Sequence, residues 1–179
     1  MFNRYHLIIK KYCDKLKIQF ISSPFDNDSA KFLCEKLKLK TIKIPSGEIT
    51  NYQLLKYLSK FQIKFILSTG LSNINEISEA IKVLKVNKSN LTLLHCNTAY
   101  PTPIKDANML AMLEMKRIFN CKIGYSDHTL GNHAAMVATS LGADIIEKHI
   151  TLNINDRGPD HKTSLNKKDF VKFDGKLTQ

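Results

Sequence analysis

Residues 121–150, with the sequence CKIGYSDHTLGNHAAMVATSLGADIIEKHI, contain two short apolar runs separated by an amphipathic stretch. The runs CKIGYSD (121–127) and ADIIEKHI (143–150) have the length and composition of buried parallel strands, and LGNHAAMVATSLGA (130–143) between them is typical of a helix. A strand, a helix and a second strand in this order form a right-handed crossover with parallel strands. The stretch therefore predicts an α/β fold.

The same alternation extends toward the N-terminus. Four further apolar runs precede this unit, with helical stretches such as NINEISEAIKVLKV (73–86) between them. These runs are IQFISSPF (18–25), TIKIPSG (41–47), KFILSTG (64–70) and LTLLHC (91–96). Repeated strand–helix units build either an open doubly wound sheet or a (β/α)₈ barrel.

The ends of the predicted strands favour the barrel. The sequence contains no G-x-G-x-x-G or G-K-[ST] motif of the kind that a nucleotide-binding sheet carries after a strand. Small, polar or ionisable residues follow the strands instead, and a barrel collects its active-site side chains from the carboxyl ends of many strands. We therefore predict a partial (β/α)₈ TIM barrel with about six βα units. The strand-end residues are Ser23, Ser46, Glu48, Ser68, Thr69, His95, Asn97, Ser126, Asp127, His128, Glu147, Lys148 and His149.

The length predicts one domain, residues 1–179, that is an incomplete barrel. A closed barrel of this type has eight strands and typically about 250 residues. The chain opens on a helix-like segment, RYHLIIKKYCDKL (4–16), with no strand before it. The missing units are therefore expected to be the first two.

Composition excludes several classes of function. The net charge of +11 comes mainly from scattered lysines, with only three arginines, which is typical of a solvated surface that attracts small anions and not of a nucleic-acid interface. No apolar run is long enough to span a bilayer, and the N-terminus lacks the apolar core of a signal peptide. The four cysteines are widely spaced, as in a reducing compartment. We expect a cytoplasmic protein that binds neither nucleic acid nor membrane.

Two histidines at the ends of consecutive strands indicate a metal site. His128 and His149 lie at matching depth on strands that would run about 4.8 Å apart, so that their imidazoles can converge on one divalent ion. Two nitrogen ligands leave coordination positions open for water or substrate, which suits Lewis-acid catalysis. Glu147 alternates with His149 and should share its face, while Lys148 should face the helix layer. Glu147 could be a ligand, could orient a ligand or could belong to an internal ion pair.

A second group of strand-end residues indicates anion binding. Lys43, Ser46 and Glu48 in KIPSGE combine a cation, a hydroxyl and a carboxylate at one strand end. Lysine and serine suit a phosphate or carboxylate, and Glu48 suits a hydroxyl or a proton transfer. Three neutral residues are predicted to surround the same anion as hydrogen-bond donors: Ser68, Asn97 and Ser126.

These strand ends, taken in order, resemble those of the sialic acid synthase family, whose members condense phosphoenolpyruvate with N-acetylmannosamine or a related acetamido sugar. The resemblance covers nearly the whole chain. The matching stretches are SSPFD (22–26), KIPSGEITN (43–51), ILSTG (66–70), LLHCNTAYPTP (93–103), IGYSDHTLG (123–131), GADIIEKHIT (142–151) and GPDHKTSL (158–165).

The resemblance implies an N-acetylneuraminate synthase-like transferase and assigns its residues. A divalent metal, manganese or magnesium, would be bound by His128 and His149. The residues that it implies for phosphoenolpyruvate are Lys43, Ser46, Ser68, Asn97 and Ser126. Glu48 and Asp160 would lie near the sugar and the reacting carbons, so that the implied catalytic residues are Glu48, His128, His149 and Asp160, with Asp160 also binding substrate.

The resemblance also implies features that this chain is expected to lack. Complete family members are homodimers, with two further barrel strands upstream and a C-terminal antifreeze-like domain that supplies an arginine to the partner subunit's site. We therefore expect the chain not to complete the reaction alone. The alternative is an inactive truncated remnant of such a synthase, acting at most as an associating module. The acceptor sugar and the roles of Glu147 and His161 stay open.

Overall fold

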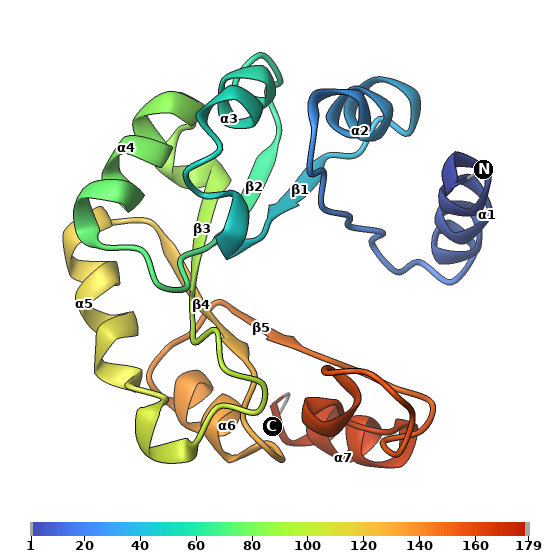
Figure 1. Ribbon diagram of the computed structural model, residues 1–179, viewed down its shortest axis with the longest axis vertical. Helices are drawn as coiled ribbons and strands as arrows, with labels where there is room; N and C mark the ends of the chain where they lie inside the picture. The colour runs from blue at the N-terminus through green and yellow to red at the C-terminus, as the bar shows by residue number, and fades with distance from the viewer. Residues whose placement is uncertain (1, 178–179) are drawn as a thin grey trace. The chain divides into compact units, whose positions relative to one another are not determined.

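The computed structural model describes residues 2–177, and they form two compact units. The first comprises the residues up to Leu67 together with Ser72–Leu91, and the second comprises Ser68–Leu71 and the residues from Thr92 onward. Parallel strands alternate with helices in both units (Figure 1), which confirms the predicted α/β class. No helix among the described residues is long and apolar enough to cross a membrane.

The first unit is built on two parallel strands. Strands β1 (Thr41–Ile44) and β2 (Lys64–Ser68) pair in parallel, with Ile42 opposite Phe65 and Ile44 opposite Leu67. These four side chains are buried, as in a strand covered on both faces. The helical segments of this unit are α1 (Phe2–Lys15), α2 (Asn27–Lys31), η1 (Phe32–Lys36), η2 (Ser46–Glu48), α3 (Tyr52–Leu58), α4 (Ile74–Leu84) and η3 (Lys88–Asn90).

The segment 18–25, predicted as the first strand, is not one. The structure has five strands among the described residues, not six, and residues 18–24 run extended beside β1 without a ladder. The amide of Lys43 donates to the carbonyl of Ser22 over 3.3 Å, and the side chain of Gln19 donates to that of Thr41 over 2.8 Å. Pro24 has no amide hydrogen to extend the pairing, which explains why an apolar run failed to form a regular strand.

The second unit contains strands β3 (Leu91–Cys96), β4 (Lys122–Asp127) and β5 (Ile145–Lys148), which pair in parallel in chain order. Helices α5 (Met109–Phe119) and α6 (His133–Ser140) pack against β4 (Figure 1). The remaining helical segments are η4 (Ile104–Asp106), η5 (His161–Thr163) and α7 (Lys167–Leu177), and α7 contacts α6.

Gly124 sets the spacing of the three strands in the second unit. In the parallel register it lies opposite Leu94 on β3 and Ile145 on β5. A Cβ atom at this position would lie 2.6 Å from Cδ2 of Leu94 and would also overlap the backbone oxygen of Ile145. The absence of a side chain therefore lets the strands keep their register below the polar strand ends.

We predict that Gly124→Ala lowers the free energy of unfolding by about 2 kcal/mol or more, because the added methyl overlaps a backbone atom that cannot move without shifting β5. Urea unfolding followed by circular dichroism measures the change. Gly47→Ala is the matched control, since a Cβ there would have no atom within 4 Å, and its effect should stay within about 0.5 kcal/mol. Equal stability of the two variants would contradict the prediction.

Candidate metal and substrate site

The register of β3, β4 and β5 arranges side chains in rows. One row across the three strands consists of Cys96, Ser126 and Glu147, which lie opposite one another in the ladder. This row is on the same face as the row that contains Gly124, two residues further along each strand. Because successive side chains alternate between faces, His128 and His149 continue the same face one step further. Their ring centroids lie 5.4 Å apart, as the strand spacing predicted.

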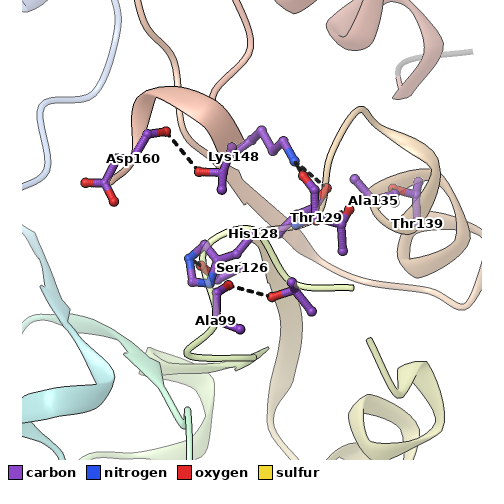
Figure 2. Close-up of polar contacts among 11 residues, drawn as sticks. Ala99, Ser126, His128, Thr129, Ala135, Thr139, Lys148 and Asp160 are labelled. Carbon is purple, nitrogen blue, oxygen red and sulfur yellow. Dashed lines mark hydrogen bonds and ion pairs between the residues drawn. The ribbon is translucent and has the colours of Figure 1, made fainter. Parts of the chain in front are cut away.

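His128 is oriented by a hydrogen bond to a backbone carbonyl. Its Nδ1 lies 2.6 Å from the carbonyl oxygen of Asn97, and because that oxygen can only accept, Nδ1 carries the proton. The hydroxyl of Ser126 lies 3.3 Å from Nε2 (Figure 2). It donates its single proton to Glu147 over 2.6 Å. Burial lowers the pKa of His128, which favours the neutral ring. In that form Nε2 keeps an unprotonated lone pair, the arrangement found in metal-ligating histidines.

Tyr100 covers the two imidazoles and was missed by the sequence reasoning. Its ring centroid lies 4.2 Å from that of His128 and 5.9 Å from that of His149. The loop carrying Tyr100 is tied down by Thr102, whose amide donates to the carbonyl of His128 and whose hydroxyl donates to the carbonyl of Ala99 (Figure 2). An aromatic residue in the loop after a strand that ends in polar groups was the signal available in the sequence.

Two buried polar atoms beside the strand ends have no hydrogen-bond partner among the described residues: Oγ of Ser68 and Oδ1 of Asn97. The side-chain nitrogen Nδ2 of Asn97 donates to the carbonyl of Asp106, so the side-chain oxygen Oδ1 is the atom left for a ligand. Asn97 thus presents an acceptor in this structure, where a donor was expected. A buried polar atom without a partner costs about 1–3 kcal/mol, which a bound ligand would recover.

Asp160 and His161 belong to the loop that follows β5. The hydroxyl of Thr151 lies 2.7 Å from Nδ1 of His161, and Leu165 forms an isolated bridge with Ile150. The loop is therefore closed at its base, which gives His161 a structural role. Asp160 is exposed, and its backbone carbonyl accepts a hydrogen bond from the hydroxyl of Ser164. Burial raises the pKa of Tyr100, and the charge of Asp160 adds a smaller contribution.

The remaining predicted residues, Lys43, Ser46 and Glu48, lie in the first unit. Lys43 is half-buried on β1, and Ser46 and Glu48 lie in the short turn that follows the strand. The carboxylate of Glu48 accepts a hydrogen bond of 2.7 Å from the side chain of Asn51. Each is at a strand end, as predicted, and their role toward a substrate stays a prediction.

On the opposite face of β4 and β5, the structure contains a buried ion pair that sequence reasoning did not anticipate. Nζ of Lys148 lies 2.9 Å from Oδ2 of Asp127, and the two side chains are 1% and 0% exposed. Lys148 faces away from Glu147, as expected from the alternation, but is neutralised by a carboxylate. Glu147 accepts from Ser126, so it belongs to the hydrogen-bond network of the histidine face.

The donor set fits a metal ion with an open coordination sphere. Among the described residues no group of three or more His, Cys, Asp or Glu side chains could enclose a metal. The two imidazoles, whose centroids lie 5.4 Å apart, would therefore hold an ion together with water or substrate oxygens, which is the ligand arrangement of a catalytic metal and not of a structural one.

Comparison with known proteins identifies the family. The model of the NeuB family matches residues 2–179. The chain belongs to the NeuB family. It is 51% identical over 157 residues to the N,N'-diacetyllegionaminic acid synthase of Campylobacter jejuni, and 38% identical over 162 residues to the pseudaminic acid synthase of Helicobacter pylori. These alignments cover 86% and 90% of this chain but 47% of each relative, so the chain spans about half the length of these relatives.

Solved structures agree with this NeuB-family assignment. The N-acetylneuraminic acid (sialic acid) synthetase of Leptospira borgpetersenii, solved in complex with citrate, superposes with a TM-score of 0.92 at 33% identity, over 98% of this chain and 61% of that one. The phospho-2-dehydro-3-deoxyheptonate aldolase of Thermotoga maritima superposes with a TM-score of 0.77 at 15% identity, over 98% of this chain and 54% of that one, and shares the fold alone. The (β/α) barrel type predicted for the chain is thereby confirmed, with five strands in place of six.

We predict that the protein loses stability as pH falls from about 7 to about 5.5. Burial lowers the pKa of both His95 and His128 below the ordinary value of about 6.5. In this window the unfolded chain binds more protons than the folded one, so the free energy of unfolding decreases as pH falls. Urea unfolding at the two pH values tests the sign. Ring titration by NMR, compared with the chain in concentrated urea, should give lower pKa values in the folded protein; higher ones would contradict the prediction.

Proposed function

We propose that this NeuB-family protein acts in the cytoplasmic condensation of phosphoenolpyruvate with an acetamido sugar, giving a sialic-acid-type nonulosonate and phosphate. The observation that carries the proposal is the paired imidazoles of His128 and His149, with Nε2 of His128 unprotonated. The unpartnered oxygens of Ser68 and Asn97 support it, because they are buried at the strand ends where a polar substrate would satisfy them.

The proposed chemistry forms one carbon–carbon bond and one carbon–oxygen bond, breaks another carbon–oxygen bond, and transfers a proton from the added water to the new alkoxide. C3 of phosphoenolpyruvate attacks the aldehyde carbon of the open-chain sugar, water adds at C2, and phosphate leaves with cleavage of the C2–oxygen bond. A bound Mn²⁺ or Mg²⁺ would supply Lewis-acid polarisation of the aldehyde oxygen. His128 and His149 would hold that ion, and preorganised donors stabilise the charge that develops as the aldehyde becomes an alkoxide.

The other predicted residues have roles that follow from their groups. Lys43 and Ser46 would pair with the phosphate and carboxylate of phosphoenolpyruvate, since an ammonium and a hydroxyl suit those anions. Glu48 would exchange a proton with a substrate hydroxyl or the reacting carbons. Asp160, on the exposed loop after β5, would accept hydrogen bonds from the sugar. Ser126 could donate a hydrogen bond to phosphoenolpyruvate only if its hydroxyl turned away from the carboxylate of Glu147.

The comparisons favour an acceptor sugar with two acetamido groups. The relatives at 51% and 39% identity, from Campylobacter jejuni and Legionella pneumophila, are both N,N'-diacetyllegionaminic acid synthases, and the product of such an enzyme carries two acetyl groups. The N-acetylneuraminate-9-phosphate synthase of Mus musculus is 31% identical. We therefore propose a diacetamido-trideoxy sugar, with N-acetylmannosamine as the weaker acceptor.

Binding to the chain itself tests the site. Phosphoenolpyruvate should bind with millimolar affinity in the presence of Mn²⁺, and binding should weaken as salt is added, because the ligand is a small anion attracted by a basic protein. Asn97→Leu should weaken binding of phosphoenolpyruvate, since it removes the polar side chain that the resemblance assigns to this ligand and whose oxygen has no partner among the described residues. Isothermal titration calorimetry measures both. Absence of heat at millimolar phosphoenolpyruvate, with a folded sample, would count against the assigned pocket.

Turnover is tested by replacing the 157-residue matching segment of the Campylobacter jejuni synthase with the corresponding segment of this chain. The chimera should release phosphate from phosphoenolpyruvate with the diacetamido sugar, faster than with N-acetylmannosamine. The same chimera carrying His149→Ala should lose at least about 100-fold, because the metal contributes several kcal/mol to the transition state. Retention of metal-dependent turnover by that variant would refute the metal assignment.

A further inference from the structure

The buried ion pair between Asp127 and Lys148 connects the carboxyl ends of the two strands that carry the histidines. The two residues are opposite each other in the parallel register of β4 and β5. Nζ of Lys148 lies 2.9 Å from Oδ2 of Asp127, and both side chains are almost completely removed from solvent. Because water does not reach this pair, the two charges must be stabilised by each other and by neighbouring polar groups of the protein.

Thr129 closes the network on the other side of His128. Oδ1 of Asp127 accepts from the amide of Thr129 over 2.8 Å and from its hydroxyl over 2.7 Å. Nζ of Lys148 donates in turn to the carbonyl of Thr129 over 2.6 Å (Figure 2). Both carboxylate oxygens and three polar groups of Thr129 are thus engaged, and we call these three residues the clasp.

The clasp fixes the backbone from which both imidazoles project. Asp127 and Thr129 flank His128 in the chain, and Lys148 precedes His149. Because neighbouring side chains on a strand point to opposite faces, the clasp lies behind the sheet while the rings lie in front of it. A change in the pairing of the two strand ends would therefore move one ring relative to the other.

We propose that the clasp is a positioning device that holds the rings of His128 and His149 at the separation needed to share one divalent ion. The part of the inference that concerns a metal ion rests on the proposed function. The part that concerns the relative position of the two rings does not depend on that function. Stability alone does not account for the clasp, since a buried ion pair is often replaced by apolar residues without loss of stability. What apolar residues cannot supply is directional bonding that links both strands to the backbone beside His128.

The experiment compares the unaltered protein with the double variant Asp127→Asn, Lys148→Met, which removes both charges together and leaves an oxygen for Thr129. The first readout, in metal-free protein, is the set of nuclear Overhauser contacts from the ring of His128 to those of His149 and Tyr100, whose centroids are 5.4 and 4.2 Å away. These contacts should weaken at least about two-fold in the double variant. The second readout is Mn²⁺ affinity, expected to fall by about 10-fold or more, as for other residues that orient metal ligands.

Ala138→Gly is the control for instability. Ala138 is fully buried in α6, so that the variant weakens the fold without removing a bond of the clasp, and it should leave the ring contacts and Mn²⁺ affinity unchanged. Thr129→Val removes a single bond and should change both readouts in the same direction by a smaller amount, which keeps the test decisive if the double variant does not fold.

Unchanged ring contacts and affinity in the double variant would overturn the inference, as would an equal loss in Ala138→Gly. If the unaltered protein binds no Mn²⁺, the proposed function fails, and the ring contacts alone still decide for or against the clasp.

Discussion

The parallel register of β3, β4 and β5 is the constraint on which the candidate site depends. Alternation along a strand is strict, so a shift of one residue would turn the whole polar set to the other face of the sheet. In the observed register Ser126 lies opposite Glu147, and the next step places two imidazoles 5.4 Å apart. Gly124 permits this register, because any side chain there would meet the neighbouring strand.

The two faces of these strands satisfy their polar groups differently. Behind the sheet, the charges of Asp127 and Lys148 are matched by each other and by backbone groups, although the buried hydroxyl of Tyr125 on the same face has no partner among the described residues. At the strand ends near the histidines, Ser68 and Asn97 each present a buried atom without a partner among the described residues. Buried polar groups in folded proteins are nearly always paired, so these two atoms are candidates for contact with a ligand.

Much of this arrangement could be predicted from sequence. Short apolar runs, amphipathic segments between them and the positions of His128 and His149 are local patterns, and they indicated the strands, the helices and the meeting of the two rings. Tyr100 could not be placed, because it reaches the rings through a loop whose path is fixed by tertiary contacts. Asp127 resembled the other polar strand-end residues, and only the register with β5 identifies Lys148 as its partner. The run 18–25 resembled a strand by composition, yet ladder formation depends on a neighbour's backbone and on Pro24.

The central claim is that His128 and His149 together bind one divalent ion, and pulsed electron paramagnetic resonance of the Mn²⁺-loaded protein tests it most directly. With imidazole nitrogens labelled by ¹⁵N, the account predicts coupling to two directly bound nitrogens in the unaltered protein. A single coupled nitrogen is expected after His128→Ala or His149→Ala. Bound Mn²⁺ without any directly coupled nitrogen, or couplings that are unchanged in both variants, would contradict the account.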